Sequence, residues 1–374
     1  MSNRNRVPPL LEPYVRLPPE ASLTLLTGVL DATPTWLVVR YLDSLLGNGG
    51  RLQNTRGGNE DIMDNSNGTE DQEDVAVVLV SWMRDWEFWK TEARRGGGLD
   101  LARLAQQKRF AFVDGLTNLF APAPSDKVAP PPTRSLAPQQ QPTARSTVPA
   151  RGPSTLPIRG PPVRTPAAAP QPLPAHPQTT SPTPAPGTTT LTSPSLPHAA
   201  EKITTLVTTL PSASPARKTV LILDSPSALL ATTSTPASSL SSFILQLRSL
   251  VHSTLLVTEA DLPFLSAAAQ AAYGGVRGAY GEMAGKVTPV EAEHAAFVVQ
   301  QAHGARLVIS ARGLETGVAR DVSGVVRVGR GGGWDEEGES EVERDGVVAE
   351  MEVLYYVQAD GGVRVFERGA GDVG

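Results

Sequence analysis

An acidic residue at the end of a short aliphatic run is the first feature of this sequence that could do chemistry. Residues 220–223 are branched and apolar, and Asp224 follows them directly. In nucleotide-hydrolysing α/β proteins, a buried strand of this kind carries a carboxylate to a metal ion at its C-terminal end. Asp224 would need a phosphate-binding loop after the first strand of the same domain.

That loop is absent from its expected place. A P-loop has the pattern G-x-x-x-x-G-K-[ST], in which backbone amides surround the phosphates, the lysine offsets their charge and the hydroxyl binds Mg²⁺. After the first apolar run the chain reads TGVLDATPTW (27–36), with one glycine, no lysine and a proline that removes an amide donor. The nearest similar stretch, GEMAGKV (281–287), is one residue short and has valine in place of the hydroxyl.

A helix start explains residues 27–36 better, with Asp31 or Thr33 as the N-cap and Pro34 in the first turn. We therefore interpret Asp224 as a degenerate Walker-B-like residue with a structural role at a strand end, and a catalytic role is the less favoured alternative.

No other group of residues predicts an enzyme or a metal site. The chain has no cysteine, which excludes disulfides and thiolate ligands. The acidic runs at 47–74 and 329–345 lack the regular spacing of a calcium loop and are predicted to be solvated loops. The five histidines show no ligand spacing to one another; they are His176, His198, His252, His294 and His303. We expect no catalytic residues, no metal and no cofactor.

The elements that would position Asp224 alternate between strands and helices. Apolar runs predict strands at 23–30, 75–80, 110–113, 220–223, 254–257 and 307–310, and a closing β-ribbon at 325–328, 347–357 and 363–366. Helices are predicted at 36–46, through Trp86 and Trp89, and at 100–108, 240–251 and 290–302. This alternation predicts one α/β domain with a mainly parallel sheet and helices on both faces. If the second helix starts as early as Trp82, then Trp82, Trp86 and Trp89 share one face, which favours a core position over an interface.

A proline-rich stretch interrupts this domain, and 24 of the 34 prolines fall within residues 121–216. Proline donates no amide hydrogen and restricts the residue before it, so we predict a disordered linker with a short ordered patch at 203–210 as an alternative near its end. The expected organisation is an N-terminal extension (1–20), a first part of the domain (21–117), the linker (118–217) and a second part (218–374).

The charge and hydropathy exclude several classes of protein. Residues 117–217 carry eight Lys or Arg and two acids, so the rest is more acidic than the net charge of −5 shows. Such a surface binds nucleic acid poorly unless the contact is local or shared with partners. No apolar stretch approaches 18 residues and no basic start precedes one, so we expect neither a membrane span nor a secretion signal. We expect a cytoplasmic protein, with the nucleus as a second location.

Three further stretches carry a resemblance to a known family. Residues 77–120 (VVLVSWMRDWEFWKTEARRGGGLDLARLAQQKRFAFVDGLTNLF) combine an aliphatic strand ending in Ser, an aromatic helix, a Gly-Leu-Asp-Leu turn, a basic helix end and a strand closing in Asp-Gly-Leu. Residues 303–328 contain Leu-x-Thr-Gly and Arg-Asp-Val-x-Gly before a hairpin, and MEVLYYVQADGGVRVFERG follows near the C-terminus. The order and spacing of these motifs resemble the sixth subunit of the Elongator complex.

The resemblance implies a RecA-like fold without ATP-binding motifs, in a hexameric ring with the fourth and fifth Elongator subunits. It also implies association with the catalytic Elongator core, and a ring that binds tRNA and supports modification of the wobble uridine. The long proline-rich insertion departs from the compact family pattern.

In RecA-like rings the loops after the central strands face the pore, which here is the loop at 259–288. Its cations, Arg277 and Lys286, lie among Gly and Ala and are candidates for contact with RNA phosphates; an ordinary solvated loop is the alternative. Two other functions stay open: an autonomous RecA-type ATPase, and an adaptor that acts through the proline-rich segment.

Overall fold

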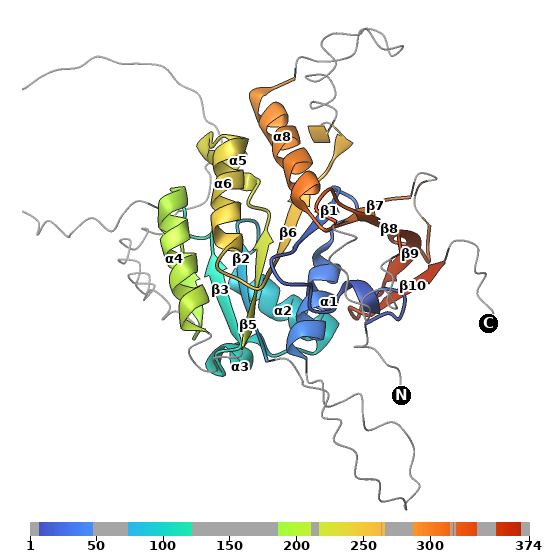
Figure 1. Cartoon of the computed structure of the whole chain (residues 1–374). Helices are drawn as coiled ribbons and strands as arrows, with labels where there is room; N and C mark the ends of the chain where they lie inside the picture. The colour runs from blue at the N-terminus through green and yellow to red at the C-terminus, as the bar shows by residue number, and fades with distance from the viewer. Residues whose placement is uncertain are drawn as a thin grey trace, which may run out of the picture. The chain divides into compact units, whose positions relative to one another are not determined.

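A ten-stranded sheet organises the molecule (Figure 1). The structure is a computed structural model, which describes residues 7–47, 74–121, 186–210, 217–262, 264–265, 287–314, 317, 319–334 and 349–367. The strands are β1 (Leu23–Gly28), β2 (Val75–Ser81), β3 (Phe110–Asp114), β4 (Thr188–Thr190), β5 (Lys218–Asp224), β6 (Ser253–Glu259), β7 (Leu307–Arg312), β8 (Gly324–Arg330), β9 (Met351–Val357) and β10 (Val363–Glu367). The described residues belong to one compact unit formed by residues 1–121 and 184–374.

The sheet is parallel over most of its width and antiparallel at one end. Its strand order is β10-β9-β8-β7-β1-β6-β5-β2-β3-β4. All pairs from β7 to β4 are parallel, whereas β7, β8, β9 and β10 pair antiparallel. Every residue of β1 and β2 is buried, as expected for strands with helices on both faces.

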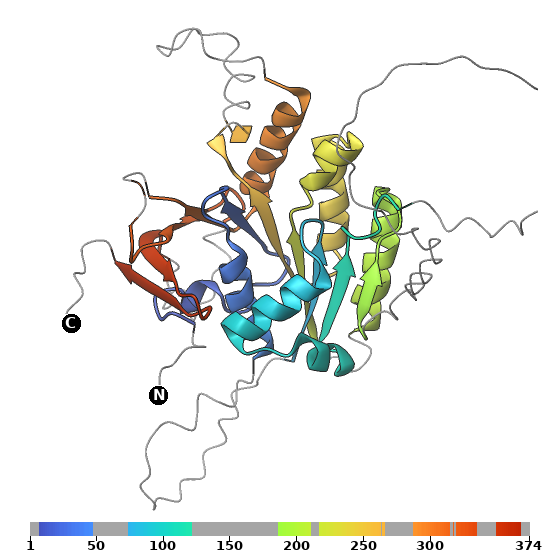
Figure 2. The ribbon, with the colours of Figure 1, turned by 180° about the vertical axis from the view of Figure 1, so that it is seen from behind.

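The helices form two layers, one on each face of the sheet. They are η1 (Glu12–Tyr14), α1 (Thr35–Leu46), α2 (Trp86–Gly97), α3 (Leu101–Gln106), α4 (Leu196–Thr209), α5 (Ala228–Thr233), α6 (Ala237–Arg248) and α8 (Pro289–Gly304). One apolar core joins α1, α2 and α3 to alternate residues of the central strands, and a second core joins α4, α5, α6 and α8 to the intervening residues. Figures 1 and 2 show these layers from opposite sides. The predicted α/β architecture with a mainly parallel sheet and an antiparallel C-terminal ribbon is confirmed.

The prediction of a disordered linker over residues 118–217 is wrong at its C-terminal end, where the alternative of an ordered patch at 203–210 is correct but too short. Residues 188–190 form β4, which pairs with β3, and residues 196–209 form α4. The second core buries Leu191, Ile203 and Val207 of this segment. Their burial offsets the conformational entropy that the segment loses when it becomes ordered. Pro197 lies in the first turn of α4, where a missing amide hydrogen costs nothing. Residues 122–185 of the predicted linker, and most of the acidic runs 47–74 and 329–345, lie outside the described residues.

The three tryptophans do not share one helical face. Helix α2 begins at Trp86, because the Asp85 side chain caps it by accepting a hydrogen bond from the Phe88 amide at 2.8 Å. Trp82 lies before the helix and packs in the second core, whereas Trp89 is buried in the first core. The core position is thus correct for Trp82 and Trp89, although they lie on opposite sides of the sheet.

Candidate functional site

The carboxyl ends of the parallel strands meet at one edge of the sheet, the upper edge in Figure 1. In open α/β sheets this edge is where ligands bind. Strand β5 ends in Asp224, β2 ends in Ser81, and β6 ends in Glu259. Register pairs Ser81 directly with Asp224, so the two side chains meet across neighbouring strands.

Asp224 is buried and saturated by partners from its own chain. The Ser81 hydroxyl donates to Oδ2 at 2.6 Å, and Nη1 of Arg84 lies 2.9 Å from Oδ1 and 3.1 Å from Oδ2. Burial raises the pKa of the Asp224 carboxyl, and the neighbouring Arg84 and the Ser81 hydroxyl oppose that rise. The Arg84 guanidinium therefore neutralises the Asp224 carboxylate and leaves neither of its oxygens without a partner.

The turn after β2 holds Arg84 in place. The Ser81 hydroxyl oxygen accepts a hydrogen bond from the Arg84 amide at 2.9 Å, which folds the chain back over the strand end. The Arg84 guanidinium also lies over aromatic rings of α2, 5.4 Å from the centroid of Phe88 and 6.0 Å from that of Trp89. The cation is thus fixed by packing as well as by charge.

A second carboxylate, Glu259, is likewise occupied. The Ser225 hydroxyl donates to Oε1 at 2.7 Å and the Ser227 hydroxyl to Oε2 at 2.6 Å. Nε2 of His294 lies 3.9 Å from Oε2. Burial alone would raise the pKa of the Glu259 carboxyl, but His294, Ser227 and Ser225 together outweigh burial and lower it to about 2.

The turn between β1 and α1 uses its backbone amides internally. Val29 and Ala32 hydrogen-bond to each other, with N–O distances of 3.3 and 3.0 Å. The Leu30 amide donates to the Asp261 carboxylate at 3.0 Å, which places a negative charge where a phosphate would need a positive one. This turn therefore presents no amide nest of the P-loop kind.

The N-cap prediction for this turn is wrong. Pro34 is the N-cap of α1, and no side chain caps the helix. The reason is the tight packing of the proline against the strand end, since a Cβ atom on Gly28 would lie 2.3 Å from Cδ of Pro34.

Of the three candidate residues named from the sequence, the structure describes only one. Asp224 lies at the carboxyl edge as expected, whereas Arg277 and Lys286 lie outside the described residues. Sequence reasoning missed Arg84 and Glu259 as members of the site. The signal was present for Arg84, which follows Ser81 by three residues in the turn after a predicted strand. Among the described residues, no group of three His, Cys, Asp or Glu could hold a metal ion.

An open groove of about 780 Å³ lies elsewhere, between α4 and α6, and shares no lining residue with the carboxyl edge. None of the helices that the structure describes has the length and hydropathy needed to cross a membrane. Comparison of the sequence with models of known protein families finds no match, and a search among curated proteins finds none either.

Proposed function

We propose that this chain is a non-catalytic, RecA-like subunit of an Elongator-type complex. In this role it forms a hexameric ring with the fourth and fifth subunits, and the ring binds tRNA and supports modification of the wobble uridine by the catalytic core. The sequence resemblance of residues 77–120 and 303–328 motivates the proposal.

The ion pair between Arg84 and Asp224 is the observation that carries the non-catalytic part. Both carboxylate oxygens of Asp224 lie within 3.1 Å of the Arg84 guanidinium, and the side chain is 1% exposed. A metal ion that activates a nucleotide needs an open oxygen ligand. An internal cation at this position supports a structural role, and the occupied amides of the β1–α1 turn support it further.

Exposed apolar side chains at the carboxyl edge support the assembly part. Leu30 is 90% exposed and Leu262 is 79% exposed. They lie close together, because the Leu30 amide is hydrogen-bonded to Asp261, the neighbour of Leu262 in the chain. Apolar groups gathered at one edge are typical of a surface that a partner covers. We assign this pair, the Leu30–Leu262 surface, to contact with a neighbouring subunit.

Affinity purification of the full chain from its own cells tests the proposal. We expect the fourth and fifth Elongator subunits to be recovered with it, in a particle whose native mass is that of a heterohexamer. Recovery without those subunits would overturn the assignment to Elongator. Recovery with them, but lost when residues 122–185 are deleted, would favour an adaptor acting through the proline-rich segment.

A further inference from the structure

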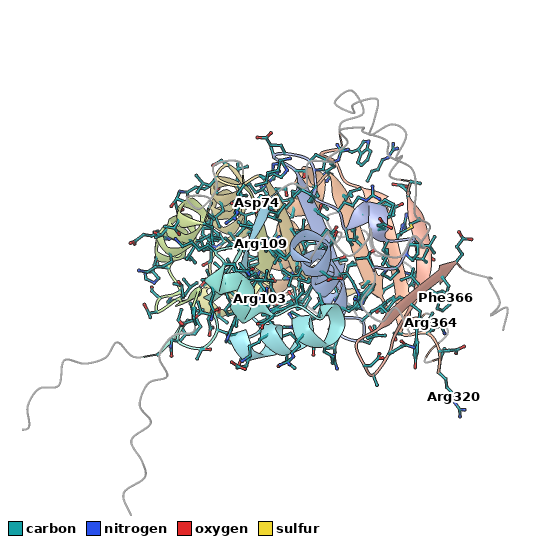
Figure 3. The ribbon with its side chains drawn as sticks, turned by 90° about the horizontal axis from the view of Figure 1, so that it is seen from below. Asp74, Arg103, Arg109, Arg320, Arg364 and Phe366 are labelled. Atoms are coloured by element: carbon teal, nitrogen blue, oxygen red, sulfur yellow. The ribbon has the colours of Figure 1, made fainter. Side chains whose placement is uncertain are left out.

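Basic side chains gather at the edge of the sheet opposite to Asp224, where β2, β3 and β5 begin. Strand β3 is preceded by Lys108 and Arg109, strand β5 by Arg217, and β5 itself begins with Lys218; Arg103 lies on the adjacent helix α3. These five residues are called the basic edge below. Figure 3 views the molecule from this side and labels Arg103 and Arg109 near Asp74.

Strand pairing holds the basic edge together. Val75 pairs with Lys218 in the register of β2 and β5, and neighbouring strands of a sheet lie about 4.8 Å apart. Nη1 of Arg217 donates to the carbonyl of Lys108 at 2.9 Å, which links the start of β5 to the start of β3 across β2. The cations are thus placed by buried strands, and their spacing is set before any ligand binds.

Three of these five cations have no carboxylate partner in the part of the chain that the structure describes. Asp74 pairs with Arg217, with 2.9 Å between Oδ2 and Nε. By contrast, Arg103, Lys108 and Arg109 form no ion pair among the described residues. Nε of Arg109 is also buried without a hydrogen-bond acceptor in this part of the chain. The exposed cations Arg103 and Lys108, beside the half-buried Arg109, are free to pair with an anionic ligand.

The backbone of Lys108 adopts an unusual conformation to make the turn between α3 and β3. Its φ is +54°, in the left-handed region that few residues other than glycine and asparagine enter. The turn closes through hydrogen bonds from the Lys108 amide to Ala105 O and from the Arg109 amide to Leu104 O, both 3.0 Å. A lysine at such a position costs stability that a glycine would not.

We propose that the basic edge binds the phosphate backbone of RNA. This inference rests on the proposed function, and it adds a contact site on the opposite edge of the sheet from Glu259 and Asp224. Arginine and lysine side chains are the usual ligands of nucleic-acid phosphates, and a local cluster is what an otherwise acidic chain needs to bind a polyanion.

RNA fits the basic edge better than an acidic polypeptide does. Protein partners are bound mainly through apolar or aromatic anchors in the centre of the contact. None of the large exposed apolar side chains of the described residues belongs to α3 or to the starts of β2, β3 and β5. A surface of cations without apolar anchors suits a ligand that is bound by its charge.

Salt-dependent binding of bulk tRNA to the purified full chain tests the proposal. The test variant is Arg103→Gln/Lys108→Asn/Arg109→Gln, in which asparagine tolerates the left-handed backbone at residue 108. Loss of three phosphate contacts is expected to reduce the slope of log K against log salt by about 2 to 3, and the affinity near 0.1 M salt by roughly tenfold or more. Weak binding to the wild-type chain, or an unchanged slope in the variant, would overturn the proposal.

The matched control is Arg320→Gln/Arg327→Gln/Arg364→Gln, which removes the same charge near the antiparallel ribbon; Figure 3 shows Arg320 and Arg364 at that end, beside Phe366. We expect the control to bind tRNA within about twofold of the wild-type chain, since its cations lie outside the basic edge. An equal loss in the control would mean that only net charge matters, and the site would be rejected.

Two further experiments distinguish loss of RNA binding from loss of folding and from binding of an acidic polypeptide. If the triple variant melts early, the double variant Arg103→Gln/Lys108→Asn, whose side chains are both exposed, replaces it, with an expected slope reduction of about 1.4 to 1.8. Polyglutamate serves as a second probe, and loss of its binding without loss of tRNA binding would assign the basic edge to an acidic polypeptide instead. All arms use the isolated chain, so failure here leaves the assembly with the fourth and fifth subunits to be judged by the purification alone.

Discussion

The side chain of Arg84 neutralises the buried carboxylate of Asp224 at the end of β5. Asp224 lies at the end of the central strand β5, and its two oxygens are held by a guanidinium and a hydroxyl. Because the carboxylate is buried, its charge has to be balanced locally, and Arg84 supplies that balance from the neighbouring strand's turn. The ion pair between Arg84 and Asp224 therefore favours a structural role for this strand end.

Removal of Arg84 should therefore destabilise the protein. In Arg84→Ala the Asp224 charge stays buried without a counterion, and we expect the free energy of unfolding to fall by about 2–4 kcal/mol, since Arg84 itself is partly exposed. Removing Arg84 raises the pKa of Asp224 further above its ordinary value, so the loss of stability should be larger at pH 7 than at pH 4 and should shrink as the pH falls through these raised pKa values, because the carboxyl then becomes protonated in both folded chains. Urea denaturation at pH 7 and pH 4 measures both effects.

The control for this change is Arg84→Ala/Asp224→Asn, which removes the buried charge as well. It should recover a large part of the stability lost by the single variant. A single variant as stable as the wild-type chain would show that Asp224 does not depend on Arg84.

Glu259 should stabilise the protein in a defined pH range. Its pKa is about 2 in the folded chain, below the ordinary value of 4.5, so its contribution is fully present above about pH 4.5 and is lost as the pH falls toward 2. The difference in stability between wild type and Glu259→Gln should therefore be larger at pH 6 than at pH 3. Thermal melts at the two pH values measure this difference.

Asp43 provides a control for Glu259, because its pKa is shifted in the opposite direction. Burial raises its pKa to about 6, against the effect of Arg40, so ionised Asp43 weakens the fold as the pH rises from about 4 to above 6. Asp43→Asn should then stabilise the protein at pH 7 by up to about 2 kcal/mol and have little effect below pH 4. The same trend in both variants would contradict the assignment of these pKa shifts.

The sequence predicts some residues of the site and misses others for a physical reason. Asp224 could be found because it directly follows a buried aliphatic run. The partners Ser81 and Arg84 lie more than a hundred residues earlier, and only the pairing of β2 with β5 brings them to Asp224. No local pattern in one sequence encodes that pairing.

At the scale of elements, strongly periodic segments were predicted correctly and proline-rich ones were not. Strand β5 and helix α8 lie within three residues of the predicted ranges, because the short aliphatic run of β5 is uninterrupted and the buried residues of α8 recur at helical spacing. Strand β4 and helix α4 were assigned to the linker, since proline, serine and threonine around them dominate the composition. Their order depends on burial of a few side chains, such as Ile203 and Val207, against the second core.

Two deletions distinguish the contribution of residues 122–185 to stability from that of β4 and α4. Replacing residues 122–185 by a short Gly/Ser linker should leave the melting temperature within a few degrees of wild type, because loop length costs little stability. Deleting residues 118–217 should prevent cooperative folding, since it removes α4 and β4 and exposes the second core. Circular dichroism melts measure both. Equal stability of the two deletions would show that α4 and β4 contribute nothing to the fold.

At the scale of the whole molecule, the proposed assembly depends on the Leu30–Leu262 surface. Leu30→Ser/Leu262→Ser should weaken capture of the fourth and fifth Elongator subunits by at least tenfold without lowering the melting temperature, because both side chains are exposed in the single chain. Leu245→Ser, at a 64% exposed position on α6, is the matched control and should leave capture unchanged. Undiminished capture by the double variant would place the subunit contact elsewhere.

Titration of the isolated full chain with Mg-ATP in a calorimeter tests most directly whether the carboxyl edge binds and hydrolyses a nucleotide. With Asp224 held by Arg84 and the β1–α1 amides occupied, we expect no saturable heat up to millimolar nucleotide and no phosphate release. Saturable binding that Asp224→Ala abolishes would contradict the non-catalytic assignment and would identify the chain as an autonomous ATPase.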